Sequence, residues 1–451
     1  MPGVTLSRWT MSYFAAALAA LLGAELLMAA GFGYPRAGLQ DPDTLVLVHL
    51  AAIGWLSLLM CGALFQFVPV LVAKPLYSNT LPLPTLIALV GGLALLLAGF
   101  LRLGGHLTIN VPFLLVAGGL LVIGFGLAIW NLGRTLWQAR PLPLPARFVL
   151  VGLFGLAATV LLGLVFALVL GGTLSLAHFT EVTALGVPIH AVAGLGGWLT
   201  LCAMGVSYRL LAMFMLAPEP GTTRTRIALH CGTAALALAV LGGLAAICLD
   251  FSRNLALALA GVPALGALGF YGADIAHMYR ARKRRRIELN SRMAILALAS
   301  LAASVLLTLA AIGLGLPDSA VAASVFLVAF GWLSGLGLAK LYKIVAFLTW
   351  LECYGPVLGK APTPRVQDLV TEDRARQWFW LYFAAMWCGT LALLFDAGLI
   401  FRVTAAAMAL ATIGIAAQLV RSRRLVNVKS EMRLPAGASR PRLLLCTSSR
   451  A

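Results

Sequence analysis

Apolar residues fill twelve long stretches of this chain, and each stretch is bounded by charged residues, prolines or glycines. A helix needs about 20 mainly apolar residues to cross a membrane, and each stretch is about that long or longer. The stretches are apolar on all sides without two-residue alternation, which excludes transmembrane β-strands. Their approximate cores are 10–33, 45–73, 81–103, 111–133, 148–171, 186–214, 227–249, 255–279, 293–315, 319–350, 377–397 and 402–420. The pattern predicts an all-α, polytopic membrane protein with about twelve transmembrane helices.

The composition agrees with this fold class, since 61% of the residues are apolar and only 11% are charged. Residues 1–9 carry a single charge, on Arg8, so we expect a short cytoplasmic N-terminus and a retained first helix instead of a cleaved leader.

The seven cysteines are scattered and form no CxxC pair. They are predicted to be small core residues and not a disulfide framework or a zinc site.

Positive charge is distributed unequally between the two ends of the predicted helices. Of the 33 Lys and Arg residues, only Arg36, Arg102, Arg253 and Arg402 fall on the side opposite the N-terminus. This asymmetry predicts cytoplasmic N- and C-termini in a cell inner membrane. The net charge of +18, with the basic run 280–286, then indicates contact with anionic lipid on the cytoplasmic side. Nucleic acid is not an expected partner, because no aromatic platform or soluble domain accompanies the run.

One sequence motif occurs three times, centred on Trp55, Trp198 and Trp332. Each Trp is preceded by Gly and followed by Leu and then Ser or Thr. A small residue stands seven positions later, and an aromatic one ten positions later; in the second and third copies this aromatic is Tyr208 and Tyr342. The small residues are expected to allow close helix approach. The Trp and Tyr side chains are expected either to pack between helices or to line a shared cavity.

The three copies predict a membrane domain of three four-helix repeats. The repeats are placed at about 10–134, 148–280 and 293–420, within a membrane domain that spans 10–420. The copies fall in the second, sixth and tenth helices, which run in the same direction, so the repeats are expected to form a ring-like bundle around an axis along the membrane normal. The basic segment 421–451 is expected to be a cytoplasmic tail that is disordered or lies on the membrane.

Twelve helices in three four-helix units, with a histidine in the outer half of the second helix, resemble subunit I of the haem-copper oxidase superfamily. This superfamily includes cytochrome c oxidases and bacterial nitric oxide reductases. The residues that carry the resemblance are His49 ahead of Gly-Trp-Leu-Ser at 54–57, His190 ahead of Gly-Trp-Leu-Thr at 197–200, and Lys-Leu-Tyr-Lys at 340–343. The resemblance implies a respiratory-chain setting, with other respiratory membrane subunits as candidate partners.

The ligand set that this resemblance implies is incomplete. His49 matches the helix 2 axial ligand of a haem, and His190 is a plausible match for a helix 6 copper ligand. Helix 10 should supply further haem ligands, but residues 318–350 contain neither His nor Met. Helix 7 should supply a histidine pair at its outer end, and its only histidine, His230, is near the other end. We therefore expect that the chain is not a complete oxygen or nitric oxide reductase, and no catalytic residue is assigned.

A reduced cofactor site near the outer face is still compatible with the sequence. His49 and His190 enter their helices at similar depth, and imidazole suits haem iron or copper. His178 is the candidate third metal ligand, with His106 and Glu181 as other outer-loop candidates. The alternative is that no cofactor binds and that both histidines are hydrogen-bonded inside the bundle.

Acidic residues give two further expectations. Glu25 is the only acid in the middle of a predicted span, and a carboxylate there costs about 2–3 kcal/mol or more unless it is neutral or paired. It is a candidate for proton handling, with a partner expected on helix 2 or 12; a structural, hydrogen-bonded acid is the alternative. Asp274 and His277 share a helix face near the inner interface and are expected to form a solvated helix end, with a proton-uptake entry as the alternative.

Three functions stay open on the sequence. The first is a haem- or copper-binding sensor, electron carrier or respiratory assembly factor. The second is a transporter or permease for a small solute, with Glu25 lining the path. The third is a structural subunit of a respiratory complex without a cofactor. No phosphate-binding loop, nucleophile elbow or dinucleotide fingerprint is present in the sequence.

Overall fold

The computed structural model describes residues 6–219 and 221–446. These residues form helices and no strands, and twelve helices are long and apolar enough to cross a membrane. Each of the twelve covers one predicted stretch, which confirms the all-α, twelve-helix prediction. The spans are Thr10–Ala30, Pro42–Val72, Pro82–Leu103, Phe113–Gln138, Leu144–Leu170, Val187–Met215, Thr223–Cys248, Arg253–Arg280, Leu289–Leu314, Asp318–Val357, Glu372–Leu394 and Gly398–Arg423.

Eight spans are single α-helices and four change helix type along their length. The single helices are α1 (Thr10–Ala30), α4 (Pro82–Leu103), α5 (Phe113–Gln138), α6 (Leu144–Leu170), α12 (Arg253–Arg280), α13 (Leu289–Leu314), α16 (Glu372–Leu394) and α17 (Gly398–Arg423). The second span is α2 (Pro42–His49), η1 (Leu50–Ser57) and α3 (Leu58–Val72), and the sixth is α8 (Val187–Ala191), η2 (Val192–Thr200) and α9 (Leu201–Met215). The seventh is α10 (Thr223–Ala237), η3 (Leu238–Gly242) and α11 (Gly243–Cys248), and the tenth contains α14 (Asp318–Phe326), η4 (Leu327–Ser334), α15 (Gly335–Tyr354) and η5 (Gly355–Val357). The short α7 (Ala177–Leu185) precedes the sixth span.

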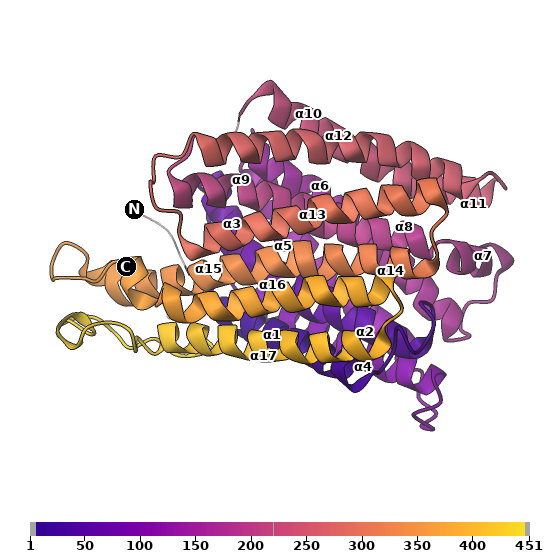
Figure 1. Ribbon diagram of the computed structural model, residues 1–451, viewed down its shortest axis with the longest axis horizontal. Coiled ribbons are helices and arrows are strands. Elements are labelled where there is room, and N and C mark those ends of the chain that lie inside the picture. The colour runs from indigo at the N-terminus through magenta and orange to yellow at the C-terminus, as the bar shows by residue number, and fades with distance from the viewer. Residues whose placement is uncertain (1–5, 220, 447–451) are drawn as a thin grey trace. The chain divides into compact units, whose positions relative to one another are not determined.

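The chain divides into two compact units, one made of residues 1–66 and 288–451 and the other of residues 67–287. In the first unit α1 packs on η1 and α17, α17 also packs on α16, and α13 packs on α15 and η4 (Figure 1). In the second unit α5 packs on α4 and α6, α6 packs on η2 and α9, and α10 packs on α12 (Figure 1). The division of the membrane domain into three repeats stays a prediction.

Each copy of the tryptophan motif lies in a π-helix. The segments η1, η2 and η4 are π-helices, and each ends at the Ser or Thr that follows Gly-Trp-Leu. In a π-helix each backbone hydrogen bond joins residues five apart, one more than in an α-helix. The helix is therefore wider, and some backbone carbonyls become accessible to side chains. Such segments are rare and often mark functional positions. The repeated sequence therefore has a repeated structural counterpart, which the apolar pattern alone did not reveal.

The glycines of the motif allow the close helix approach that the sequence predicts. A Cβ added to Gly62 would lie 2.6 Å from the Cβ of Tyr13 on α1. A Cβ added to Gly205 would lie 2.6 Å from the backbone oxygen of Pro145 on α6. The glycine before Trp198 packs directly on Gly155 of α6, where an added Cβ would meet the backbone of residues 197 and 198 at 2.7 Å. The prediction of close packing is confirmed at these contacts.

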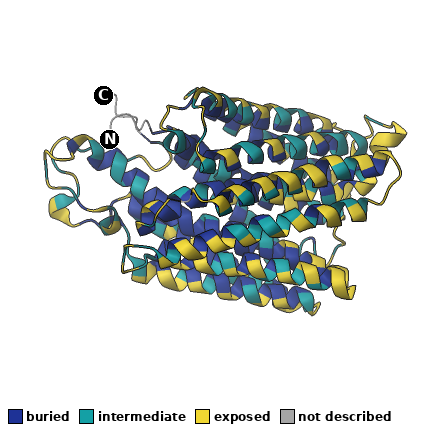
Figure 2. Ribbon diagram, turned by 90° about the horizontal axis from the view of Figure 1, so that it is seen from above, coloured by how far each residue is buried: buried dark blue, intermediate teal, exposed yellow. Residues whose placement is uncertain are grey.

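Burial follows the pattern expected of a helical membrane bundle. The three motif tryptophans are at most 1% exposed, and the exposed large apolar side chains, such as Phe154, Leu161 and Ile312, lie on single helix faces. Figure 2 shows this division along the helices, with exposed residues in yellow and buried ones in dark blue. Apolar side chains facing outward are expected where lipid is the solvent.

The described part of the C-terminal segment packs against the first unit, so the expectation of disorder is wrong for residues 424–446. The backbone N–H of Cys446 donates to the carbonyl of Arg8 at 3.0 Å, and Ser12 Oγ donates to the carbonyl of Leu444 at 2.7 Å. Leu425 and Val428 join an apolar cluster with residues of the tenth span. These contacts attach the tail to the first unit, because its few apolar side chains find a buried partner surface that composition does not show.

Candidate functional site

A buried polar cluster surrounds η4 in the first unit. We call it the η4 polar cluster, and its members are Glu25, Trp55, Ser334, Tyr382 and Thr412. All five side chains are at most 2% exposed. They come from α1, η1, η4, α16 and α17, so distant parts of the sequence supply one site. Such a cluster inside a membrane bundle is costly unless its groups satisfy one another, and polar residues at this depth are functional candidates.

Glu25 is the acid of this cluster. Its Oε1 accepts a hydrogen bond from Thr412 Oγ1 at 3.0 Å, which places its partner on the twelfth helix as one of the two predicted locations. Its Oε2 is buried and has no hydrogen-bond partner within the described residues. An unsatisfied buried acceptor costs about 1–3 kcal/mol, and more when it is charged. One oxygen of Glu25 is thus held, and the other is positioned for a proton or a ligand.

Two other members of the cluster, Tyr382 and Ser334, donate to backbone carbonyls of the π-helix η4. Tyr382 OH donates to the carbonyl of Phe330 at 2.9 Å, and Ser334 Oγ donates to the carbonyl of Ala329 at 2.7 Å. Trp55 Nε1 donates to Ser334 Oγ at 2.7 Å, which joins the second span to the tenth. The sequence did not identify Tyr382 or Thr412 as site residues, and it gave Ser334 only as part of the repeated motif. Each of the three could have been noticed only as a hydroxyl group in the middle of an apolar span.

His49 lies at the end of α2, six residues before Trp55. Its Nδ1 is 2.8 Å from the backbone carbonyl of Leu45, which can only accept, so the ring donates there. A histidine oriented by such a bond to a carbonyl is the usual form of a metal-ligating histidine. The residue types and the local geometry at His49 are therefore compatible with one metal ligand.

The space between the second and tenth spans does not fit a haem with axial ligands from both. Trp55 and Ser334 are in direct contact, and a Cβ added to Gly337 would lie 2.7 Å from Leu59 Cδ2. In the register of the repeat, the tenth-span position equivalent to His49 is Phe326. Its ring lies 4.8 Å from that of Phe330, so an aromatic pair stands where a second ligand would be required.

The second unit contains the other histidines that the sequence singles out. His190, in α8, packs its ring 5.4 Å from that of Phe166 and lies against Gly163 of α6. His178, in α7, and His230, in α10, are exposed. In the described ranges, no three His, Cys, Asp or Glu side chains gather in a way that could hold a metal ion. The assignment of His49, His190 and His178 to one metal site stays a prediction.

Tyr208 takes part in a second buried network. Its OH donates to Asp274 Oδ2 at 3.2 Å, and Thr225 Oγ1 donates to the same oxygen at 2.7 Å. Arg224 Nε lies 3.4 Å from Asp274 Oδ1. Asp274 is 3% exposed, so the expectation of a solvated helix end is wrong for this residue. Neighbouring spans cover it, which a single-helix pattern cannot show; His277 is exposed as expected.

The end of the tenth span carries a third polar group. Lys343 Nζ lies 2.8 Å from Glu288 Oε2, and both side chains are largely buried. Tyr342 is 3% exposed and packs its ring 5.8 Å from that of Phe379. Its hydroxyl is buried without a hydrogen-bond partner within the described residues. Tyr342 and the three motif tryptophans are buried, and the choice between packing and cavity lining stays a prediction.

Comparisons with known proteins add a fold but no close relative. Neither protein-family models nor curated protein sequences gave a match. Among solved structures, 26 chains match. One belongs to a cryo-EM structure of a heme-copper terminal oxidase dimer, and it superposes with a TM-score of 0.58 at 13% sequence identity. The match covers 98% of this chain and 86% of that chain. At this identity the similarity concerns the fold, and the chain is a multi-pass membrane protein with a fold like that of subunit I of the haem-copper oxidases.

Proposed function

We propose that this chain is a proton-coupled membrane transporter for a small solute, built on the oxidase fold, in which Glu25 binds and releases a proton inside the membrane. The observation that carries the proposal is the orphan Oε2 of Glu25, a fully buried acceptor with no hydrogen-bond partner within the described residues. A carboxyl group at this depth is stabilised by a proton or by a bound polar ligand. Either would satisfy Oε2.

The surrounding residues suit a group that changes its protonation state. Thr412 holds Oε1 through a hydroxyl and not through a positive charge. An ion pair would hold the carboxylate permanently charged, whereas a hydroxyl partner can accompany the acid in both forms. Tyr382, whose OH donates to the carbonyl of Phe330, gives the cluster a second hydroxyl. The proton would therefore reside on Glu25 Oε2, with Thr412 fixing the rotamer.

The same packing argues against oxidase chemistry as the function. A complete reductase requires ligands that this chain lacks in the tenth and seventh spans, and Phe326 and the Trp55–Ser334 contact occupy the region between the second and tenth spans. We therefore derive no reaction step through a haem pair.

Proton flux into vesicles tests the proposal. Purified protein is reconstituted into liposomes containing a pH-sensitive dye, and an inside-negative potential is imposed with potassium and valinomycin. Wild type should acidify the interior faster than protein-free liposomes, and Glu25→Gln should lower this rate about tenfold. Glu181→Gln, which removes an exposed acid of α7, is the matched control and should keep the wild-type rate. Equal rates for Glu25→Gln and wild type would refute the proposal.

A second candidate function is a single haem or copper site at His49. The observation that favours it is the Nδ1 hydrogen bond to the Leu45 carbonyl, which orients the ring as is usual for a metal-ligating histidine. His49 would hold the metal, and the metal would supply electron transfer or sensing. The test is an optical spectrum with iron and copper content for wild type and His49→Ala after expression with haem and copper supplied. A Soret band or bound copper lost in the mutant would establish this site, and its absence in wild type would exclude it.

The surroundings of the protein are proposed from sequence. The charge asymmetry favours a cell inner membrane with both termini cytoplasmic and anionic lipid around the basic ends. The oxidase fold makes other respiratory membrane subunits candidate partners, and a purely structural role in such a complex is the third candidate. Co-purification of respiratory subunits in mild detergent, unaffected by Glu25→Gln and His49→Ala, would favour that role over transport.

A further inference from the structure

A cavity of about 380 Å³ lies where the C-terminal segment folds back over the end of α17. It is lined by Arg423, Arg424, Arg440, Pro441 and Leu443, and we call it the arginine pocket. All five residues belong to the first unit. The volume is within the range of small-molecule sites. Three guanidinium groups and no carboxylate line it, so an anion is the chemical class of ligand that it favours.

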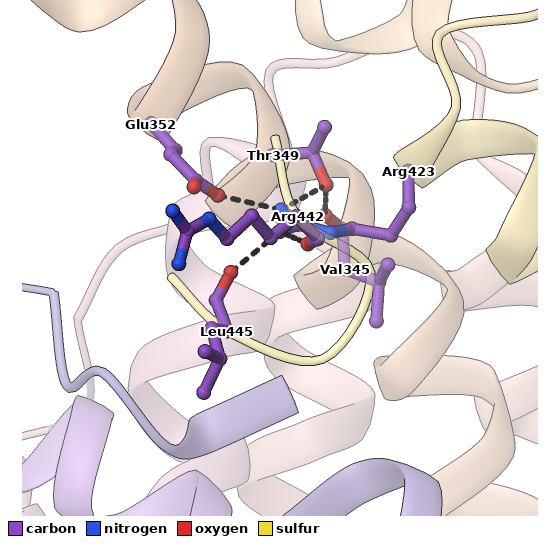
Figure 3. Close-up of polar contacts among 6 residues, drawn as sticks. All are labelled: Val345, Thr349, Glu352, Arg423, Arg442 and Leu445. Atoms are coloured by element: carbon purple, nitrogen blue, oxygen red, sulfur yellow. Dashed lines mark hydrogen bonds and ion pairs between the residues drawn. The ribbon is translucent and has the colours of Figure 1, made fainter. Parts of the chain in front are cut away.

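Arg423 forms the buried wall of the pocket. It is 3% exposed, and its Nη1 donates to Glu352 Oε2 at 2.7 Å and to Thr349 Oγ1 at 3.1 Å. Its Nη2 donates to the carbonyls of Leu445, at 3.1 Å, and Arg442. Figure 3 shows the side chain held between α15 and the returning tail. Its Nε is buried without a hydrogen-bond partner within the described residues, so one donor of a fixed guanidinium has no acceptor.

The remaining charge of the pocket is uncompensated. Glu352 neutralises Arg423, whereas Arg424 and Arg440 are exposed and have no carboxylate partner within the described residues. Two positive charges therefore remain at the pocket mouth, on two segments that only the fold brings together. The C-terminal end of α17 adds a partial negative charge, which is weaker than one full charge and is outweighed by the arginines.

We propose that the arginine pocket binds a phosphate group and that the bound phosphate fastens the C-terminal segment to α17. Arginine binds phosphate oxygens through paired N–H donors, and this geometry suits a phosphomonoester or phosphodiester better than a halide. Pro441 and Leu443 add an apolar wall beside the charged one. The phosphate can come from the headgroup of an anionic lipid or from a soluble phosphate compound. The proposal is independent of proton transport by Glu25.

The test compares two variants that each lose two positive charges. Arg424→Gln with Arg440→Gln removes the exposed arginines of the pocket, whereas Arg374→Gln with Arg376→Gln removes exposed arginines at the start of α16, outside both the pocket and the basic run 280–286. Neither pair includes the buried Arg423, so folding is preserved. The probes are inorganic phosphate, measured by the shift in thermal unfolding in detergent, and nanodiscs of phosphatidylcholine with or without phosphatidylglycerol, measured by lipid retention in native mass spectrometry.

The pocket variant should bind the probe about tenfold more weakly than wild type, because two charge-assisted contacts are lost. The α16 variant should bind as wild type does. A loss seen with inorganic phosphate identifies a soluble phosphate ligand, and a loss seen only with phosphatidylglycerol identifies a lipid headgroup. Equal binding by the two variants, or no binding of either probe by wild type, would overturn the proposal.

Discussion

Single side chains decide how this fold departs from the oxidases that it resembles. Trp55 donates to Ser334 at 2.7 Å and closes the contact between the second and tenth spans. Glu25 keeps an orphan oxygen in the same cluster. The Trp55 and Ser334 side chains thus occupy part of the region in which a haem with axial ligands from both spans would be expected. The Glu25 carboxyl carries the proton binding that we propose in place of haem chemistry.

The Trp55–Ser334 hydrogen bond should be measurable as a coupling between two substitutions. Trp55→Phe removes the donor, and Ser334→Ala leaves the indole N–H buried without an acceptor, so each should lower the free energy of unfolding by about 1–3 kcal/mol. The double mutant should lose about 1 kcal/mol less than the two single effects together. Chemical unfolding in detergent gives all four values, and strict additivity would show that the bond contributes nothing.

Cys446 should be an unreactive thiol. Burial, with a smaller contribution from the Glu352 carboxylate, raises its pKa to about 12. Since this folded pKa exceeds that of the unfolded thiol, the folded state holds the proton more tightly. The resulting stabilisation is fully present below about pH 8.5 and is lost as the pH rises toward 12. Iodoacetamide at pH 8, followed by peptide mass spectrometry, should label Cys446 at least about tenfold more slowly in folded than in denatured protein.

Comparable labelling of Cys446 in the two states would mean that the tail does not pack as described. Arg374→Gln serves as the control for this measurement, because it changes an exposed charge of α16 outside the arginine pocket, and its labelling rate should equal that of wild type.

At the scale of elements, the three motif copies become three π-helices. The sequence predicted twelve spans and their approximate ends, because length and hydrophobicity alone determine which segments can cross a membrane. It also placed Gly62 and Gly205 at close contacts. It did not predict the π-helices η1, η2 and η4. A local shift of the backbone hydrogen bonds by one residue does not change how apolar the stretch is, so hydrophobicity cannot reveal it.

The glycine contacts differ enough to be tested against each other. Gly62→Ala would place a Cβ 2.6 Å from Tyr13 Cβ, so the helices must separate, and the free energy of unfolding should fall by about 1–3 kcal/mol. Gly119→Ala, in α5, meets no neighbouring atom within 4 Å and should be neutral or stabilising, as alanine usually is in a helix. Thermal unfolding of the two variants measures the difference, and equal values would contradict the close approach of α1 and α3.

At the scale of the whole molecule, the fold could be predicted and the site only in part. Twelve hydrophobic stretches and a repeated motif were sufficient to indicate an oxidase-like fold, which the structural similarity supports at 13% identity. Glu25 was identified as a candidate because an acid in a span is rare. Its neighbours Tyr382 and Ser334 were not, because a hydroxyl in a span has many structural explanations. The folded tail was missed because its contacts join residues that are far apart in the sequence, as in the hydrogen bond from Tyr354 OH to the carbonyl of Arg433.

Infrared spectroscopy of the reconstituted protein tests most directly whether Glu25 exchanges a proton. The absorption of a protonated carboxyl group is compared in wild type, Glu25→Gln and Glu181→Gln, before and after a pH gradient and an inside-negative potential are imposed. We expect a protonated-carboxyl band in wild type and Glu181→Gln that changes in intensity under the gradient and is missing in Glu25→Gln. A band assigned to Glu25 that stays constant under every gradient would contradict the account and make this residue a structural acid.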